Sequence, residues 1–243
     1  MKLISLNGRK SLQTPRGAEL FCNYLRKHRP EVLLIQDATK VGRTFTPPAG
    51  YVLLAGGERL AICGVTPATV TLAHMSSSLL VVRIGDVTIF NVYLSPYKSS
   101  ERIEQLNALT EIVAADRDSL KMIAGDFNLS PEPVDGMFGD ELSRWTTSGE
   151  REALGRLLSV GRLVDVLAAS KTKLQDYTFE RTIRDRVSRF RCDLLLVSDV
   201  AQDCDASYDH ATRIGTLAFT DHSAIMARIP VIVSEPDLLS AIG

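Results

Sequence analysis

Apolar side chains recur at helical spacing in three stretches of the chain. Residues 17–29 and 101–115 place apolar positions three and four residues apart, and residues 150–160 repeat the pattern over a shorter length. This spacing gathers the apolar side chains on one face of a helix, so each stretch predicts an amphipathic helix. Ser99 or Ser100 is expected to cap the second of these helices.

Shorter apolar runs between these helices predict strands. The run at residues 31–36 is continuous, which is typical of a strand buried on both faces. Runs that follow one another without a helix indicate antiparallel pairs, and helical crossovers indicate parallel pairs, so we expect two mixed sheets with helices outside them. Residues 128–148 are rich in Pro, Gly and acidic residues and are expected to form a surface loop. The predicted strands are residues 2–6, 31–36, 51–54, 60–64, 68–72, 79–84, 87–94, 121–124, 193–197, 212–217 and 223–229.

The composition is that of an ordinary globular protein. The chain has 243 residues, 45% of them hydrophobic, and a formal net charge of −1. This charge excludes a generally basic nucleic-acid coat but leaves room for a local basic face. No apolar run approaches the roughly 18 residues of a membrane span, and the apolar N-terminal stretch is too short for a secretory signal. We therefore expect a cytoplasmic protein with reduced cysteines, no membrane partner and one domain over residues 1–243.

The sharpest candidate for chemistry is Gly125-Asp126-Phe127-Asn128, which directly follows a predicted buried strand. Side chains two apart on an extended chain share a face, so Asp126 and Asn128 place a carboxylate beside an amide at a sheet edge. An Asx turn leaving the strand explains the same residues equally well.

A second candidate is Asp221-His222, which precedes the last predicted strand. Neighbouring side chains on a strand point to opposite faces, so both reach one site only if the chain bends there. Asp193 opens another apolar strand, where a charge is costly unless it is paired. His222 would be a fitting partner, because a carboxylate fixes the tautomer of an imidazole and raises its basicity. The alternatives are a surface turn for Asp221-His222 and a strand cap for Asp193.

Polar side chains also mark the ends of other predicted strands, and each is weak by itself. Together they lie at the ends of six strand-like segments, and this convergence is what an active site at a sheet edge requires. The set is Asn7, Asp37, Tyr93, Asp126, Asn128, Asp193, Asp221 and His222.

The chain resembles the endonuclease/exonuclease/phosphatase superfamily, and within it the exonuclease III-like apurinic/apyrimidinic endonucleases. Any one motif is weak, but the motifs occur in family order and span nearly the whole chain. They are residues 1–7, residues 34–37, Asn91-Val92-Tyr93, residues 125–131, residues 161–165, Tyr177-Thr178-Phe179, residues 192–196 and Thr220-Asp221-His222. The resemblance implies a four-layer α/β sandwich and a magnesium-dependent phosphodiesterase.

The resemblance also implies the ligands of a metal ion. Asn7 and Asp37 would hold Mg²⁺ or Mn²⁺, with Asp221 nearby. Oxygen ligands and few carboxylates suit Mg²⁺, which keeps waters and phosphate oxygens for its remaining positions. The family has glutamate where this chain has Asp37, so the carboxylate here is one methylene shorter.

The remaining residues take catalytic roles by the same resemblance. Asp126 would orient or deprotonate the attacking water, and Tyr93 would contact the phosphate. Asn128 and His222 would stabilise the transition state, with Asp193 orienting His222. The abasic-site branch tends to carry a tryptophan pair after the Tyr-Thr motif, whereas this chain continues with Phe179-Glu180.

A basic segment precedes the strand that opens with Asp193. Guanidinium groups suit phosphates, so these arginines are candidate substrate-binding residues, although a solvated loop has the same composition. They are Arg181, Arg184, Arg186, Arg189 and Arg191.

These observations favour a monomeric Mg²⁺-dependent phosphodiesterase of DNA repair, acting on duplex DNA at abasic sites or 3′ ends. Two alternatives stay open. One is a phosphatase or phosphodiesterase of the same superfamily with a small-molecule or lipid substrate. The other is a catalytically weakened nucleic-acid-binding homologue, because Asp37 departs from the family pattern.

Overall fold

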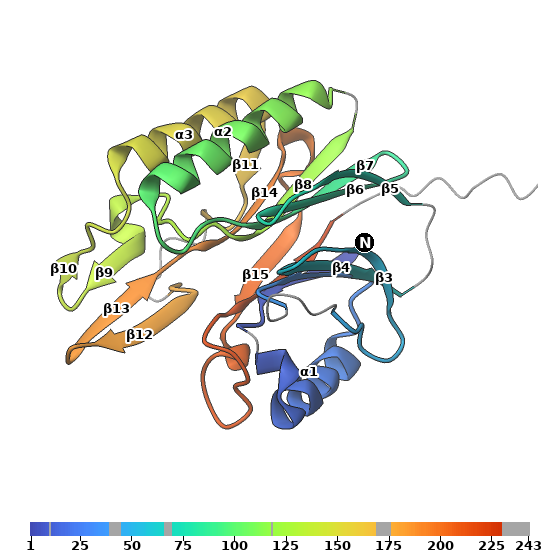
Figure 1. Cartoon of the computed structure of the whole chain (residues 1–243), viewed down its shortest axis with the longest axis horizontal. Coiled ribbons are helices and arrows are strands. Elements are labelled where there is room, and N and C mark those ends of the chain that lie inside the picture. The colour runs from blue at the N-terminus through green and yellow to red at the C-terminus, as the bar shows by residue number, and fades with distance from the viewer. Residues whose placement is uncertain (10, 39–44, 66–69, 118, 169–175, 230–243) are drawn as a thin grey trace, which may run out of the picture.

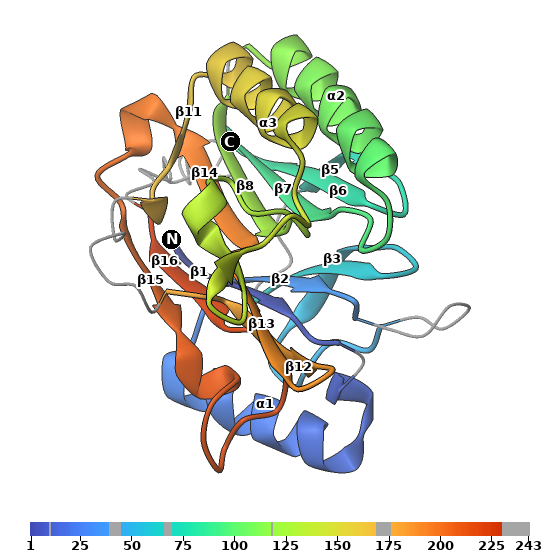
Figure 2. The ribbon, with the colours of Figure 1, turned by 90° about the vertical axis from the view of Figure 1, so that its left-hand side faces the viewer.

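Four layers make up the body of the protein: one helix, two stacked β-sheets and a pair of helices (Figure 1). The computed structural model describes residues 1–9, 11–38, 45–65, 70–117, 119–168 and 176–229. Helix α1 (Pro15–His28) covers the first sheet, and helices α2 (Ser99–Ala115) and α3 (Ser148–Gly161) cover the second (Figure 2). This is the predicted α/β sandwich of two mixed sheets. Among the described residues, no helix is long and apolar enough to cross a membrane.

The first sheet joins strands from both ends of the chain. Strands β1 and β2 are parallel, and the other neighbours in this sheet are antiparallel, as expected of a mixed sheet. In spatial order the strands are β15 (Asp205–Asp209), β16 (Ala224–Arg228), β1 (Lys2–Asn7), β2 (Val32–Gln36), β4 (Leu60–Gly64) and β3 (Val52–Gly56).

The second sheet has one parallel pair, β7 with β8, which α2 connects. Its spatial order is β11 (Leu163–Asp165), β14 (Asp193–Ser198), β8 (Leu120–Asp126), β7 (Val87–Tyr93), β6 (Leu79–Ile84) and β5 (Val70–Met75). The strand predicted at residues 68–72 overlaps β5, and its residues 68 and 69 lie outside the described part of the chain.

A third, four-stranded sheet projects from one end of the sandwich, and the sequence analysis did not predict it (Figure 1). Its strands, in spatial order, are β10 (Glu141–Leu142), β9 (Gly136–Phe138), β13 (Arg186–Phe190) and β12 (Phe179–Ile183). Residues 128–148 are therefore not one loop. Arg184 and Asp185 both have positive φ, 48° and 62°, and form the two-residue turn between β12 and β13 that matches the strand twist. We call this sheet the arm.

Two further local predictions were wrong. Residues 212–217 are not a strand: a 3₁₀ turn ends at Thr212, and Gly215 has a φ of +98°, which breaks an extended chain. The cap of α2 is Lys98, without a side-chain hydrogen bond. Ser99 instead donates its hydroxyl to Glu150 of α3 at 2.8 Å, which ties the two helices together.

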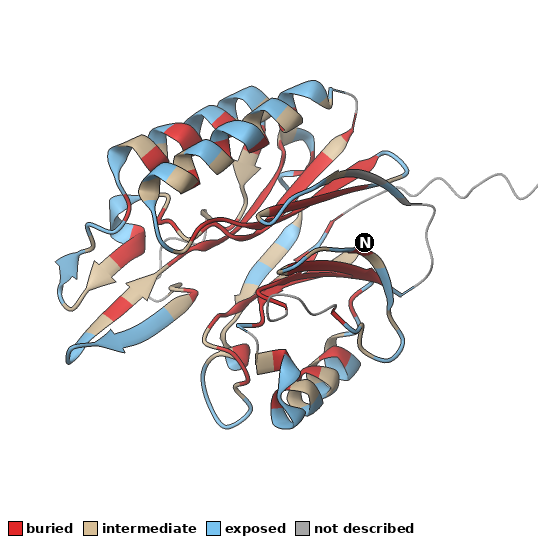
Figure 3. Ribbon diagram, in the orientation of Figure 1, coloured by how far each residue is buried: buried red, intermediate tan, exposed pale blue. Residues whose placement is uncertain are grey.

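Buried residues concentrate on the strands between the layers (Figure 3). Polar contacts cross the apolar core between the two sheets at Asn91, where Gln36 Nε2 of β2 donates to Asn91 Oδ1 of β7 at 2.7 Å. Asn91 Nδ2 in turn donates to the carbonyl oxygens of Ile35 and Ala61. A buried amide needs such partners, so this contact fixes the position of one sheet against the other.

Candidate active site

The predicted polar residues meet in one cleft, of about 850 Å³, where strand ends of both sheets face the arm. Asn7 closes β1, Tyr93 closes β7 and Asp126 closes β8. Asp126 and Asp193 lie behind the surface of the cleft. The residues of the predicted set that line it are Asn7, Asp37, Tyr93, Asn128, Asp221 and His222.

Asp126 is buried at the centre of this group. Asn7 Nδ2 donates to Asp126 Oδ2 at 2.8 Å, and Asn128 contributes its backbone amide at 2.9 Å and its side-chain amide at 3.2 Å. The preceding Gly125 has a φ of +147°, and a Cβ there would come within 2.0 Å of the Val92 carbonyl oxygen. Glycine is therefore required for β8 to reach this position beside β7.

His222 and Asp193 form the pair that the sequence indicated. His222 Nδ1 donates to Asp193 Oδ2 at 3.0 Å, and Asp193 lies opposite Asp126 in the β14–β8 pairing. Thr178 supports this arrangement, because its hydroxyl accepts the backbone amide of Asp193 at 3.2 Å. The other ring nitrogen, His222 Nε2, lies 3.9 Å from Asp126 Oδ2, too far for a direct hydrogen bond. Both atoms thus keep hydrogen-bonding capacity for a bound group.

Burial and charge shift the titration of both groups. Burial raises the pKa of Asp126 to about 6; Asp193 adds to this and His222 opposes it. Burial lowers the pKa of His222, but the carboxylates of Asp193 and Asp126 outweigh it and raise this pKa to about 9. Between these values Asp126 is an anion and His222 a cation, which is the pairing that a base and an anion-stabilising donor require.

We expect the rate of hydrolysis to follow a bell-shaped pH profile. Activity rises as Asp126 loses its proton near pH 6 and falls as His222 loses its proton near pH 9. The measurement is kcat/KM for a small phosphodiester between pH 4.5 and 10. An alkaline limb that is unchanged in His222→Gln would contradict the assignment of His222.

Asp37 has a partner that the sequence analysis missed. Arg59 donates to Asp37 Oδ1 from Nε at 3.1 Å and from Nη2 at 2.8 Å. Its Nη2 also donates to the Tyr93 hydroxyl at 2.7 Å, and the guanidinium carbon lies 4.2 Å from the centroid of the Tyr93 ring. The antiparallel pairing of Gln36 with Leu60 extends to these residues, since the amide of Ala38 donates to the Arg59 carbonyl. The strand register therefore puts Arg59 opposite Asp37.

The three predicted metal ligands fit a hard cation by their donor chemistry, since each offers an amide or carboxylate oxygen. Asp221 gives the clearest indication. Its Oδ2 accepts from Arg9, whereas Oδ1 is buried and has no hydrogen-bond partner among the described residues. A cation would satisfy that oxygen. Asn7 Oδ1 accepts the Arg9 amide at 2.9 Å, and Asp37 shares its carboxylate with Arg59.

Cys192 brings a sulfur to the same place. Ligand atoms of Asp126, Cys192 and His222 lie within 4.8 Å of one another, and all three residues are buried. Burial, and then the charges of Asp126 and Asp193, raise the pKa of the Cys192 thiol well above its usual range. The thiol therefore stays protonated at neutral pH and is not a nucleophile.

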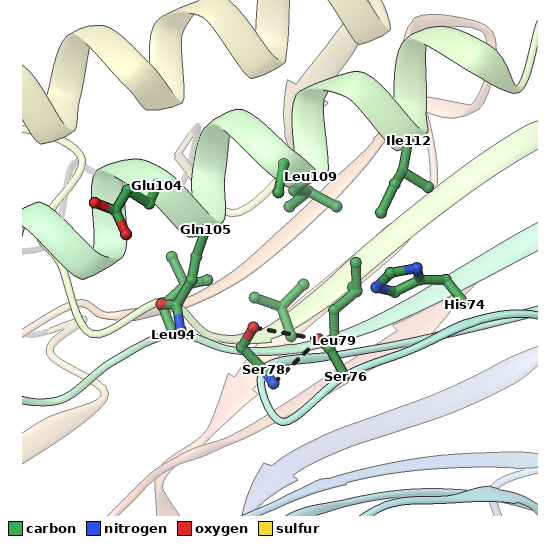
Figure 4. A pocket seen from close by; sticks show the side chains of 11 residues that line it. His74, Ser76, Ser78, Leu79, Leu94, Glu104, Gln105, Leu109 and Ile112 are labelled. Carbon is green, nitrogen blue, oxygen red and sulfur yellow. Dashed lines mark hydrogen bonds between the residues drawn. The ribbon is translucent and has the colours of Figure 1, made fainter.

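A second cavity, of about 230 Å³, lies between α2 and the β5–β6 hairpin (Figure 4). Leu79, Leu109 and Ile112 face its interior, and His74 and Glu104 come from opposite sides. It holds no cluster of charges like the one around Asp126.

The structure separates the five arginines of the basic segment. Arg181, on β12, lines the cleft. Arg184 is at the tip of the β12–β13 turn, Arg186 pairs with Glu141 at 3.3 Å, and Arg189 pairs with Glu180 at 2.8 Å. Arg181, Arg184 and Arg186 are exposed, and Arg189 is partly buried.

Arg191 does not lie on the substrate side, which corrects the prediction for this residue. Its side chain is 3% exposed and donates to Asp135 at 2.9 Å and to Asp165 at 2.8 Å. In the sequence, Arg191 looks like the other arginines of the basic segment. Its burial depends on the packing of this segment against the residues around Asp135 and Asp165, which the sequence does not show.

Arg191→Ala is expected to lower the free energy of unfolding by about 3–5 kcal/mol, because it leaves two buried carboxylates without their cation. Urea denaturation measures the change. Arg181→Ala is the control, since the exposed Arg181 should change stability by less than about 0.5 kcal/mol. Equal, small losses in both variants would contradict a structural role for Arg191.

Comparison with solved structures gives strong matches along nearly the whole chain. The structure of an AP endonuclease from Archaeoglobus fulgidus superposes with a TM-score of 0.76 at 21% identity, covering 95% of this chain and 100% of that one. The 3′-5′ exonuclease NExo from Neisseria meningitidis also gives 0.76, at 23% identity, covering 94% and 99%. A structure of the Neisseria 3′ phosphatase NExo bound to a product DNA hairpin gives 0.76 at 23% identity, covering 95% and 100%.

These matches establish the fold. The chain shares its four-layer fold with an AP endonuclease and with a 3′-5′ exonuclease, and this fold is the one that the resemblance implied. No family model matches the sequence, and no curated protein does.

Proposed function

We propose that this protein is a metal-dependent DNA phosphodiesterase of the exonuclease III and AP endonuclease type. The observation that carries the proposal is the contact series from Asn7 through Asp126 and His222 to Asp193 at the floor of a cleft. It combines a buried base with an oriented, cationic imidazole, as hydrolysis of a phosphodiester requires. The structural neighbours that act on DNA support the choice of substrate.

In the proposed reaction, Asp126 accepts a proton from the attacking water. The amides of Asn7 and Asn128 hold the carboxylate in one orientation while it does so. His222 donates from Nε2 to a phosphate oxygen as negative charge develops there, and Asp193 keeps the ring in the tautomer and orientation that this needs. Water attacks phosphorus, the bond from phosphorus to the leaving oxygen breaks, and that oxygen takes up a proton from solvent. Asp126 returns the proton it accepted to solvent before the next turnover.

Asn7 and Asp221, with Asp37, would hold Mg²⁺ or Mn²⁺ in this proposal. The cation would neutralise charge on the phosphate and lower the pKa of a bound water. Asp221 Oδ1 is buried and has no hydrogen-bond partner among the described residues, which supports a ligand role for Asp221.

The arm, together with the segment that follows β10, supplies a surface that suits a nucleic acid. Trp145 is 43% exposed, lines the cleft and donates its indole N–H to the Asn128 carbonyl at 3.2 Å. Arg181 lines the same cleft, so the cleft offers both an aromatic ring and a candidate phosphate ligand. We further propose one domain over residues 1–243, a monomer, and a cytoplasmic role in DNA repair.

The test compares labelled duplexes that carry an abasic site, a recessed 3′ end or a 3′ phosphate with an intact duplex and a small chromogenic phosphodiester, all with Mg²⁺. We expect at least one of the three modified duplexes to be cleaved at a rate well above that of the intact duplex. Asp126→Asn protein, purified in parallel, controls for contaminating nuclease. A wild type that hydrolyses the small ester but neither binds nor cuts any duplex would replace this proposal with a small-molecule phosphoesterase.

Salt dependence tests the role of the arm. Arg181→Ala should weaken binding to every duplex and lower the slope of log K against log salt by about 0.9, because one phosphate contact is lost. Fluorescence anisotropy from 50 to 300 mM salt measures the slope. Arg162→Ala is the control, because Arg162 pairs with Asp199 away from the cleft residues. A slope identical to wild type in Arg181→Ala would remove this residue from the interface.

A further inference from the structure

Arg59 is a charged cleft residue that neither the motifs nor the resemblance assigned. It precedes β4 and reaches the cleft between Asp37 and Tyr93. Its side chain is 24% exposed, whereas that of Asp37 is 7% exposed. The carboxylate is thus covered and the guanidinium is the part of the pair that borders solvent.

The hydrogen bonds of Arg59 are all on one edge of the guanidinium. Nε and Nη2 donate to Asp37 and Nη2 also to Tyr93, while Nη1 has no acceptor among the described residues. The tyrosine ring packs against the guanidinium at 4.2 Å and restricts its rotation. A guanidinium held on one edge, with donors left on the other, is preorganised for a phosphate.

The same contacts change what Asp37 can do. Its side chain is one methylene shorter than the glutamate of the resembling family and follows a backbone with a φ of +46°. One of its oxygens accepts two N–H groups of Arg59. A cation approaching Asp37 therefore meets a fixed positive charge and a carboxylate that is already partly neutralised.

We propose that Arg59 supplies a permanent positive charge at this site. It forms a salt bridge with Asp37 and presents its free N–H groups to a phosphate of the substrate. Asp37 is then a positioning residue for Arg59 more than a metal ligand, and metal binding rests on Asn7 and Asp221. The inference deepens the proposed function and relies on it only for the identity of the phosphate ligand.

The first experiment measures binding without catalysis. In excess chelator, isothermal titration with inorganic phosphate should show affinity at least tenfold weaker in Arg59→Gln than in wild type, with Arg59→Lys between them. In a separate titration without phosphate, Mn²⁺ binding followed by electron paramagnetic resonance should become several-fold tighter in Arg59→Gln, because Asp37 is released. Asp37→Asn should change Mn²⁺ affinity less than Asp221→Asn does.

Arg162→Gln is the matched control. Arg162 binds one oxygen of Asp199 from Nε at 3.1 Å and from Nη2 at 2.7 Å, nearly the geometry of the Arg59–Asp37 pair, but on an exposed surface outside the cleft. It should leave both affinities unchanged. The melting temperatures of all variants show whether a loss of affinity comes from a loss of folding. If Arg59→Gln unfolds, Arg59→Lys, which retains the positive charge, is the variant that tests the inference.

Unchanged phosphate affinity in a folded Arg59→Gln, or Mn²⁺ affinity that stays the same or weakens, overturns the inference. Neither readout requires DNA or turnover. If wild type fails to cut any duplex but both affinities shift as expected, the proposed function fails while the role of Arg59 stands.

Discussion

Replacing Asp126 with asparagine should lower kcat by about 10²- to 10⁴-fold, because the variant retains the shape of the side chain but has no base to accept a proton from water. Asp126 is 1% exposed, and two asparagine amides hold its carboxylate in one orientation. His222→Ala should lower kcat by about 10²-fold or more, because the developing charge loses its donor.

Steady-state kinetics on the best duplex measures both effects, with far-ultraviolet circular dichroism and melting temperature as controls for folding. Cys192→Ala is a matched control at the same buried place, since it truncates a neighbouring side chain and leaves Asp126 and His222 unchanged. A folded Asp126→Asn or His222→Ala variant with a near-wild-type rate would remove that residue from the mechanism.

Removing divalent cations should abolish hydrolysis, and Mg²⁺ or Mn²⁺ should restore it. The ligands offered by Asn7, Asp37 and Asp221 are oxygens, which favour these ions over softer metals. Activity is measured after dialysis against chelator and then across a Mg²⁺ titration. Full activity in chelator would contradict the metal assignment.

Two variants separate the contributions of Asp221 and Asp37 to metal binding. Asp221→Ala should raise the Mg²⁺ concentration for half-maximal activity more than Asp37→Ala does. No described residue hydrogen-bonds to Asp221 Oδ1, whereas Arg59 already holds Asp37. The reverse order would return Asp37 to the role that the sequence resemblance implies. Identical titrations for Asp221→Ala and wild type would exclude Asp221 as a ligand.

The elements that the sequence predicted are those with a pattern of apolar residues within their own segment. Continuous apolar runs marked β2 and β4, and helical spacing marked α2 and α3, because burial on two faces or on one stripe imposes these patterns directly. The arm was missed because its strands are short and half-exposed. In β12 (Phe179–Ile183) only Phe179 is partly buried, and pairing with β13 rather than a hydrophobic pattern makes the segment extended.

In the candidate site, too, the residues marked by a local pattern could be predicted and the others could not. Asp126, Asp193 and His222 could be proposed from strand ends, since polar residues after buried runs converge at a sheet edge. Arg59 could not, because its place depends on the register of β2 with β4, which no local pattern encodes. Arg191 looked like its four neighbours in composition, and only its two buried carboxylate partners distinguish it.

The polar contact between Gln36 and Asn91 has a consequence for the order of synthesis and assembly. It joins the two sheets at the level of the site, and each sheet carries only part of the catalytic group: Asn7 on the first, Asp126 and Asp193 on the second. β1 pairs with β16, which lies late in the chain, and His222 comes just before that strand. A nascent chain therefore has no complete site until β16 has emerged and docked. Under the proposed function, incompletely made or half-folded molecules would have no cutting activity.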